Sequence, residues 1–178
     1  MKDSFQTTAI KRNKLSAPTQ ILVSKNYLYQ SDAILDYGCG HGSDVELLRD
    51  QGFDAVGYDR FNPKFGYSHG HEVFLSKMIQ DKFGCNVVIC NYVFNVIANP
   101  QERQHLIDTL RKVPAKTFVA VRSDQSSIKH TWKYDQIAGG YYTKRSFQRI
   151  YTERDVFEEF GPEIEIIKSN KSLILFVL

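Results

Sequence analysis

The sequence predicts an α/β fold with an open, mostly parallel sheet and helices on both of its faces. Residues 33–59 contain a strand, a glycine turn, a helix and a second strand in that order, which is one β-α-β unit. Two further apolar strands, at 86–90 and 117–121, flank a helical pattern that starts near Pro100. Segments 163–168 and 173–178, joined by the polar turn SNKS, predict a closing antiparallel hairpin.

The chain is expected to form one domain over residues 15–178, preceded by a flexible basic segment over residues 1–14. Its 178 residues, 42% of them hydrophobic, are enough for one substantial core. The first element is a helix within 17–29, because Pro18 suits a first helical turn and apolar residues follow at Ile21, Leu22 and Leu28.

The β-α-β unit carries the features of a ligand site. Its first strand ends at Asp36, and Gly38, Gly40 and Gly42 follow at alternate positions. Such glycines allow positive φ and bring backbone amide groups close to a ligand. The second strand delivers Asp59 about twenty residues after the first glycine, where a carboxylate meets ribose hydroxyls in nucleotide-binding folds.

The helix of this unit is predicted from Ser43 to Gly52. Val45, Leu47 and Leu48 lie on one side of it, and Gly52 follows as a C-terminal glycine. Its first turn carries Asp44.

The glycine spacing and the acids together indicate the kind of ligand. The spacing is G-x-G-x-G, whereas dinucleotide folds use G-x-G-x-x-G. Asp36 and Asp44 would repel a phosphate, but they favour a ligand with a sulfonium and an ammonium group. S-adenosylmethionine fits this description.

Three segments resemble motifs of the class I S-adenosylmethionine-dependent methyltransferases. DYGCGHG resembles their glycine-rich motif, VGYDR their ribose-binding motif, and CNVVICNYVFNVIANPQER the strand that ends beneath the transferable methyl group. The resemblance spans residues 15–178. It implies a Rossmann-like class I methyltransferase fold, with a mostly parallel seven-stranded sheet and a C-terminal antiparallel hairpin.

A narrower resemblance is to the methyltransferases associated with DNA phosphorothioation, through KRNKLSAP, NYVFNVI and YYTKRSFQRIYTERD. It implies a methyl-transfer reaction but little about the acceptor. Between residues 61 and 86 the chain carries GYSHGHEVFLSKMIQDKFG, which is longer and more basic than the family pattern. The adenine-contacting residues, which usually lie in this interval, are therefore not assigned.

The site residues follow from the turn, the strand ends and the resemblance. The expected cofactor contacts are Asp36, Tyr37, Gly38, Cys39, Gly40, Gly42, Asp44, Asp59, Arg60 and Asn91. The groups expected on the methyl side, where catalysis occurs, are Asn91, Tyr92 and Asn95. Amide and phenol groups orient an amine or hydroxyl but are not strong bases, which favours an acceptor with an available lone pair.

Other reaction types are disfavoured by the same segment. Asn91 lacks the Pro-Pro sequence that usually follows it in exocyclic amino methylation, and Cys90 has no activating neighbour for a nucleophilic role. We expect no metal, since His69, His71 and Glu72 lie close together without a distant partner.

The net charge of +3 is concentrated in two segments, one before the first strand and one in the long loop expected over residues 122–149. Basic and aromatic side chains of this kind favour an anionic, nucleic-acid or nucleotide-like acceptor. The expected acceptor contacts are Lys11, Arg12, Lys14, Tyr142, Lys144, Arg145 and Arg149. The alternative is a solvated tail and an ordinary aromatic cover.

Two other functions stay open: a small-molecule methyltransferase, and an S-adenosylmethionine-binding accessory protein without activity. No apolar run is long enough to span a membrane, and the three cysteines show no paired spacing. We therefore expect a cytoplasmic protein without a membrane partner. A large acceptor would call for a protein partner, since no separate recognition domain is expected.

Overall fold

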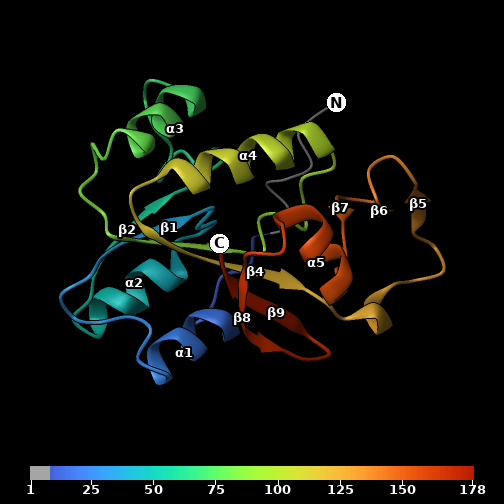
Figure 1. Cartoon of the computed structure of the whole chain (residues 1–178), viewed down its shortest axis with the longest axis horizontal. Coiled ribbons are helices and arrows are strands. Elements are labelled where there is room, and N and C mark those ends of the chain that lie inside the picture. The colour runs from blue at the N-terminus through green and yellow to red at the C-terminus, as the bar shows by residue number, and fades with distance from the viewer. Residues whose placement is uncertain (1–8) are drawn as a thin grey trace.

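The computed structural model describes residues 9–178, which form an α/β fold around a central sheet (Figure 1). Within this range the sheet has six strands in the order β2-β1-β3-β4-β9-β8. These strands are β1 (Ala33–Tyr37), β2 (Asp54–Tyr58), β3 (Val87–Asn91), β4 (Lys116–Arg122), β8 (Glu165–Ser169) and β9 (Leu173–Val177). The helices are α1 (Ala17–Ser24), α2 (Ser43–Asp50), α3 (His71–Ile79), α4 (Pro100–Lys112) and α5 (Glu153–Phe160).

The sheet is parallel from β2 to β4 and antiparallel from β4 to β8, as predicted. β1 lies between β2 and β3, so the chain moves to one side of β1 and later returns to the other. In open α/β sheets, ligands bind at the carboxyl ends of the strands where the order switches in this way. The topology therefore places a site above β1 and β3.

Helices cover both faces of the sheet, which confirms the predicted layers. Figure 1 shows α3, α4 and α5 over one face and α1 and α2 over the other. Neighbouring residues on a strand face opposite cores: Val88 and Cys90 join the first cluster, whereas Val87 and Ile89 join the second. Burial on both faces explains the unbroken apolar sequence of β3 and β4.

Side-chain caps mark the starts of α4 and α5. Asn99 caps α4 by accepting hydrogen bonds from the Gln101 and Glu102 backbone, and Thr152 forms a capping box with Asp155 at the start of α5. The first helix lies within the predicted range and ends at Ser24; Asn26 takes a φ of 57° and turns the chain two residues later.

The central sheet has six strands within the described residues, not the seven implied by the resemblance. The interval between β2 and β3 holds one helix, α3, and no strand. Its apolar residues Phe74, Leu75 and Met78 have helical spacing and bury one face. β2 is consequently an edge strand, and Val56 remains 42% exposed.

The loop expected over residues 122–149 is instead partly folded as a small antiparallel sheet. It contains the strands β5 (Lys133–Asp135), β6 (Gly140–Tyr142) and β7 (Phe147–Gln148), which lie beside α5 in Figure 1. Asp135 accepts hydrogen bonds from the Ile137 and Ala138 backbone and so fixes the turn between β5 and β6.

The sequence predicts flexibility over residues 1–14. Of these, residues 1–8 lie outside the described residues. Residues 9–14 have no regular secondary structure, and the Arg12 backbone N–H donates to the Ser43 hydroxyl at 3.0 Å. The start of the described chain therefore runs beside the glycine turn. None of the described helices is long and apolar enough to cross a bilayer.

Candidate active site

The glycine turn leads from β1 into α2 and is hydrogen-bonded to the end of β2. Gly38, Gly40 and Gly42 have φ values of 75°, 57° and 78°, as the sequence predicts. The Gly38 and Cys39 N–H groups both donate to the Tyr58 carbonyl, at 2.7 and 3.0 Å. A Cβ on Gly38 would lie 2.4 Å from a methyl carbon of the Val93 side chain, so this position needs glycine for space as well as for conformation.

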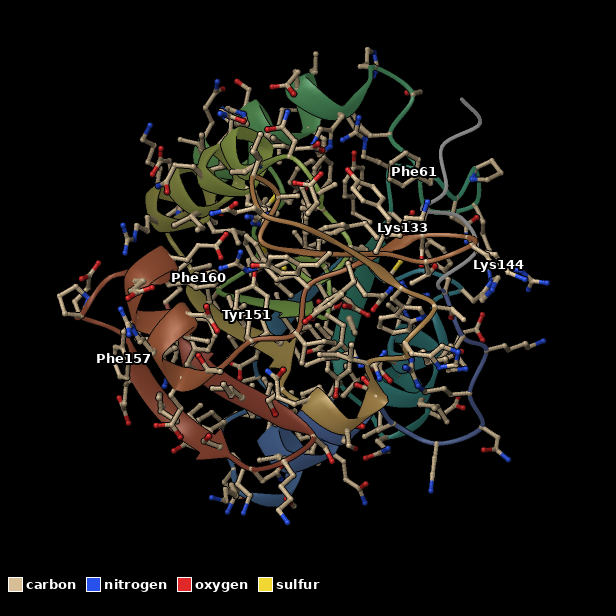
Figure 2. All side chains as sticks on the ribbon, turned by 90° about the vertical axis from the view of Figure 1, so that its right-hand side faces the viewer. Phe61, Lys133, Lys144, Tyr151, Phe157 and Phe160 are labelled. Atoms are coloured by element: carbon tan, nitrogen blue, oxygen red, sulfur yellow. The ribbon has the colours of Figure 1, made fainter. Side chains whose placement is uncertain are left out.

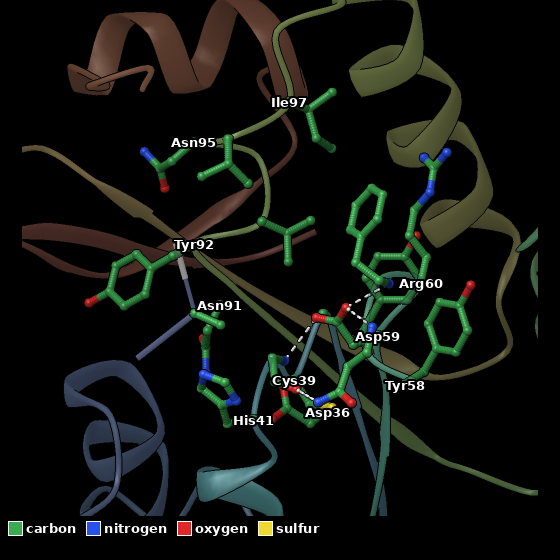
Figure 3. Close-up of a pocket in the computed structure, with 18 of the residues that line it drawn as sticks. Asp36, Cys39, His41, Tyr58, Asp59, Arg60, Asn91, Tyr92, Asn95 and Ile97 are labelled. Atoms are coloured by element: carbon green, nitrogen blue, oxygen red, sulfur yellow. Dashed lines mark hydrogen bonds between the residues drawn. The ribbon is translucent and has the colours of Figure 1, made fainter. Parts of the chain in front are cut away.

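Asp59 follows β2 and ties its loop to the glycine turn. One carboxylate oxygen accepts from the Gly40 N–H at 2.9 Å, and the other accepts from the N–H groups of Phe61 and Asn62 at 2.9 and 3.1 Å. Figure 3 shows this carboxylate beside the turn at one side of the pocket. The oxygen that bonds Gly40 has lone-pair capacity for a further donor.

Asp36 is the next-to-last residue of β1 and is buried, with 3% of its surface exposed. Burial raises the pKa of its carboxyl well above the ordinary value, and the nearby Asp44 and Asp59 carboxylates raise it further. The Arg12 guanidinium acts in the opposite direction. A cationic ligand near Asp36 would act as Arg12 does: it would lower the pKa of this carboxyl and so favour its ionised form.

Asp44 in α2 anchors the first helix. Its carboxylate accepts from the Ser16 N–H at 2.8 Å, the Ser16 hydroxyl at 2.5 Å and the Thr19 hydroxyl at 2.7 Å. The buried charge is therefore well solvated by hydrogen bonds. Asp44 also lines the cavity described below, so it can act on a ligand through its charge.

The last residue of β3, Asn91, and the next residue, Tyr92, lie at the same edge of the sheet. The Asn91 amide nitrogen donates to the Thr19 hydroxyl at 2.8 Å, while its Oδ1 is buried without a hydrogen-bond partner among the described residues. Tyr92 has a φ of 63°, uncommon for a side chain of this size. Burial raises the pKa of its phenol, which therefore stays protonated and can donate a hydrogen bond.

Asn95 has a different environment from the other two residues expected to be catalytic. It is 1% exposed; its Nδ2 donates to the Arg149 carbonyl at 2.5 Å and its Oδ1 accepts from the Arg122 N–H at 3.0 Å. Its amide thus joins the end of β4 to the end of β7. This arrangement favours a positioning role.

These groups surround one cavity of about 970 Å³, the main cavity of this structure. Figure 3 shows Asp36, Cys39 and Asp59 around it, with Tyr92 and Asn95 on another side. The expected cofactor and methyl-side residues that line it are Asp36, Tyr37, Gly38, Cys39, Gly40, Asp44, Asp59, Arg60, Asn91, Tyr92 and Asn95. Gly42 is not among the lining residues, although both of its neighbours are.

Several lining residues were not predicted from the sequence. The Tyr58 hydroxyl lies 2.7 Å from His71 Nδ1, and the two rings stack with their centroids 5.9 Å apart. Arg60 forms an ion pair with Glu102 at 2.6 Å. The apolar spacing of residues 74–78 would have indicated the helix that carries His71. Tyr58, Arg60 and His71 lie in or beside the interval left without adenine assignments, whereas Glu102 lies in α4.

Cys90 is an unsuitable nucleophile. It is completely buried, and burial followed by the charge of Asp36 raises the pKa of its thiol. Cys39 lines the main cavity, but burial raises its pKa as well. Among the described residues, no group of three His, Cys, Asp or Glu side chains could hold a metal ion.

The residues expected to bind an acceptor divide into three groups. Arg12 lines the main cavity, whereas its close sequence neighbours Lys11 and Lys14 are exposed. Lys144 and Arg145 line a second, more open cavity of about 420 Å³ at the end of β4, and its other cationic lining residues are Arg122 and Lys129. The remaining two, Tyr142 and Arg149, line neither cavity.

Arg149 braces the interior of the protein. Its guanidinium forms an ion pair with Glu159 at 3.1 Å, lies 4.7 Å from the centre of the Tyr151 ring and donates to the Gly139 carbonyl. Only 14% of the side chain is exposed. Tyr142 is 46% exposed and packs its ring edge against Phe147.

Comparisons with solved structures and with family models agree on the fold. Comparison with curated sequences gives no match. The glycopeptide N-methyltransferase MtfA, solved with S-adenosylmethionine, is 10% identical with a TM-score of 0.54, and the match covers 96% of this chain and 97% of that chain. The CcbJ methyltransferase from Streptomyces caelestis is 10% identical with a TM-score of 0.58, over 99% and 98% of the two chains.

A third similar structure is the magnesium protoporphyrin IX methyltransferase ChlM from Synechocystis PCC 6803, at 15% identity and a TM-score of 0.51, covering 90% of this chain and 82% of that chain. The family model of the methyltransferase domain matches residues 9–164, a range that contains the glycine turn, Asp59 and the segment after β3. This match supports an enzyme over an accessory protein without activity. The chain belongs to the methyltransferase domain family.

Proposed function

We propose that the main cavity binds S-adenosylmethionine and that the protein transfers its methyl group to a nucleic-acid or nucleotide-like acceptor. The observation that carries the first part is the convergence of the glycine turn, Asp36 and Asp59 on one cavity at the switch point of the sheet. The similar solved structures with bound S-adenosylmethionine and S-adenosylhomocysteine support the same cofactor.

The residues present fit this cofactor. Asp44 and Asp59 line the cavity with carboxyl groups, and a sulfonium or ammonium group beside Asp36 would favour the ionised form of that carboxyl. Asp59 would hold the ribose hydroxyls, and the glycine turn would admit the methionine part. The unpartnered Asn91 Oδ1 is a buried acceptor that a ligand donor would satisfy.

When bound, the cofactor supplies a methyl group activated by a positively charged sulfur. The protein then has to orient the acceptor and exclude water. Asn91 and Tyr92 supply an acceptor oxygen and a phenolic donor for this orientation, and Asn95 holds their segment against β4 and β7. None of the three is a strong base, so an acceptor nitrogen or oxygen with a free lone pair is the suitable partner.

The positions of three short segments support the choice of acceptor. The segments KRNKLSAP, NYVFNVI and YYTKRSFQRIYTERD resemble the methyltransferases associated with DNA phosphorothioation and are far apart in the sequence. The first two contribute lining residues to the main cavity, and the third contributes mainly to the second cavity. Arg12 thus lines the main cavity, and Lys144 and Arg145 line the second. Cations placed in this way favour an acceptor that carries phosphate.

A small-molecule acceptor is the second candidate. It is favoured by the similar structures, whose names include a glycopeptide methyltransferase and a magnesium protoporphyrin methyltransferase. Within residues 9–178 the elements form one α/β unit, without a separate domain with which to recognise a polymer.

Incubation with methyl-labelled S-adenosylmethionine and fractionated nucleic acids, nucleotides, metabolites and proteins tests the proposal. We expect the label in the nucleic-acid or nucleotide fraction. Label only in an uncharged metabolite or in protein would contradict the proposed acceptor, and cofactor binding with no labelled fraction would contradict methyl transfer. Arg12→Ala is a suitable variant, and Lys25→Ala, an exposed cation after α1, is its control.

A further inference from the structure

The second cavity is strongly basic. Arg122, Lys129, Lys144 and Arg145 line it, and among the described residues no aspartate or glutamate does. Its lining therefore differs from that of the main cavity, where the carboxyl groups of Asp36, Asp44, Asp59, Glu72, Glu102 and Asp124 outnumber the guanidinium groups of Arg12, Arg60 and Arg122. Two adjoining cavities lined in this way would separate a cationic cofactor from an anionic acceptor.

The hairpin between β6 and β7 fixes two of these cations. The Thr143 hydroxyl accepts from the N–H groups of Arg145 and Ser146 at 3.1 and 2.9 Å, and the Thr143 N–H donates to the Ser146 carbonyl at 2.8 Å. Lys144 and Arg145 consequently occupy the tip of a defined turn. Figure 2 shows Lys144 at the edge of the face formed by this small sheet.

Two residues connect the cavities. Arg122 and Gln148 each line both of them. Arg122 is the last residue of β4, and its N–H donates to Asn95. Its guanidinium is close enough to Tyr92 to lower the pKa of the phenol, although burial raises that pKa by more. Gln148 in β7 is only 8% exposed. A ligand seated at Arg122 therefore adjoins the predicted methyl side of the main cavity.

Trp132 adds an aromatic surface to the same cavity. Its ring lies 6.3 Å from that of Tyr141 and is partly exposed. An indole beside several cations provides both a stacking surface and phosphate donors, the combination used to hold nucleotides. Four cations also exceed what a single carboxylate needs, and they match a phosphate monoester, which carries about −1.5 to −2 charges at neutral pH.

We propose that the second cavity binds a phosphate group of the methyl acceptor, with the attached base against Trp132 and the reacting group directed past Arg122 into the main cavity. This inference rests on the proposed methyltransferase function. It assigns acceptor recognition to Arg122, Lys129 and Trp132 in addition to the predicted Lys144 and Arg145.

Trp132 provides the assay, because it is the single tryptophan of the chain. Its fluorescence is followed during titration with uridine 5′-monophosphate, with uridine and with a uridine hexanucleotide at low salt. Uracil compounds avoid competition for an adenosine site in the main cavity. We expect a saturable change with the two phosphate-bearing ligands and a much weaker response to uridine.

The variant Lys129→Ala/Lys144→Ala should weaken binding of the monophosphate about 10- to 100-fold, as expected for the loss of two charge-assisted contacts. Lys168→Ala, an exposed cation on β8 outside both cavities, is the matched control and should bind normally. Tighter binding of the hexanucleotide than of the monophosphate would identify a polynucleotide as the source of the phosphate, and equal binding a mononucleotide; either result supports the site.

Equal affinity for uridine and its monophosphate would overturn the inference, as would equal binding by the double variant and the control. Calorimetric titration of S-adenosylmethionine into the same protein separates the two proposals. Normal cofactor binding without any response to phosphate-bearing ligands removes the second cavity as an acceptor site and leaves cofactor binding in the main cavity intact.

Discussion

Asp59→Ala should weaken S-adenosylmethionine binding while leaving the fold intact. The carboxylate already accepts from the backbone of Gly40, Phe61 and Asn62, and a ribose diol would add up to two charge-assisted hydrogen bonds. Bonds to a charged group contribute roughly 1.5–3 kcal/mol each, and competition with the backbone donors reduces their sum. We expect a loss of about 2–3 kcal/mol, which is a ~30- to 150-fold rise in Kd.

Isothermal titration calorimetry measures this loss directly. Asp54→Ala is the control, since Asp54 is an exposed carboxylate at the opposite end of β2. Asp59→Asn keeps an oxygen acceptor but removes the charge, so it separates ligand binding from support of the glycine turn. Urea denaturation of each variant verifies folding. Affinity equal to that of the unmodified protein in folded Asp59→Ala would refute the assignment of Asp59 to the ribose.

Three further predictions concern Asp36, Cys90 and Asn95. Because the pKa of Asp36 is raised in the folded state, unfolding releases its proton and stability falls as pH rises from the ordinary pKa to the folded one. Asp36→Asn should therefore raise the thermal midpoint of the ligand-free protein at pH 7 but not below about pH 4. The same variant should weaken cofactor binding. An equal shift of the thermal midpoint at both pH values would contradict this reasoning. Cys90→Ala should retain methyl incorporation within about threefold, since its buried thiol is neutral; complete loss in folded protein would indicate a nucleophile. Asn95→Ala should lower the unfolding free energy in urea by about 2–4 kcal/mol through loss of its two buried hydrogen bonds, and an unchanged midpoint would contradict this role.

The cofactor side of the site was predictable because its determinants are local. The positive φ values of the glycine turn require glycine, and the acids at the ends of β1 and β2 are placed by the strands that precede them. The alternation of strands and helices likewise sufficed to predict a mostly parallel sheet with helices on both faces. The strand count was wrong because it came from the resemblance and not from the residues between 59 and 86.

The acceptor side was less predictable because it depends on contacts between distant residues. Asn95 binds the backbone of Arg149, 54 positions away, and this contact joins the segment after β3 to the small sheet. The inward direction of Arg149, which the sequence placed among the acceptor contacts, follows from Glu159 and Tyr151 in and beside α5. Gly139 and Gly140, at the start of β6, were a usable hairpin signal, but the second cavity needs three separate segments.

A crystal structure with bound S-adenosylhomocysteine is the most direct test of the central claim. We predict the ribose against Asp59, the amino acid part beside Asp36 and the glycine turn, and the sulfur facing Asn91 and Tyr92. Density for the ligand outside the main cavity, or no binding by well-folded protein at saturating ligand, would contradict it.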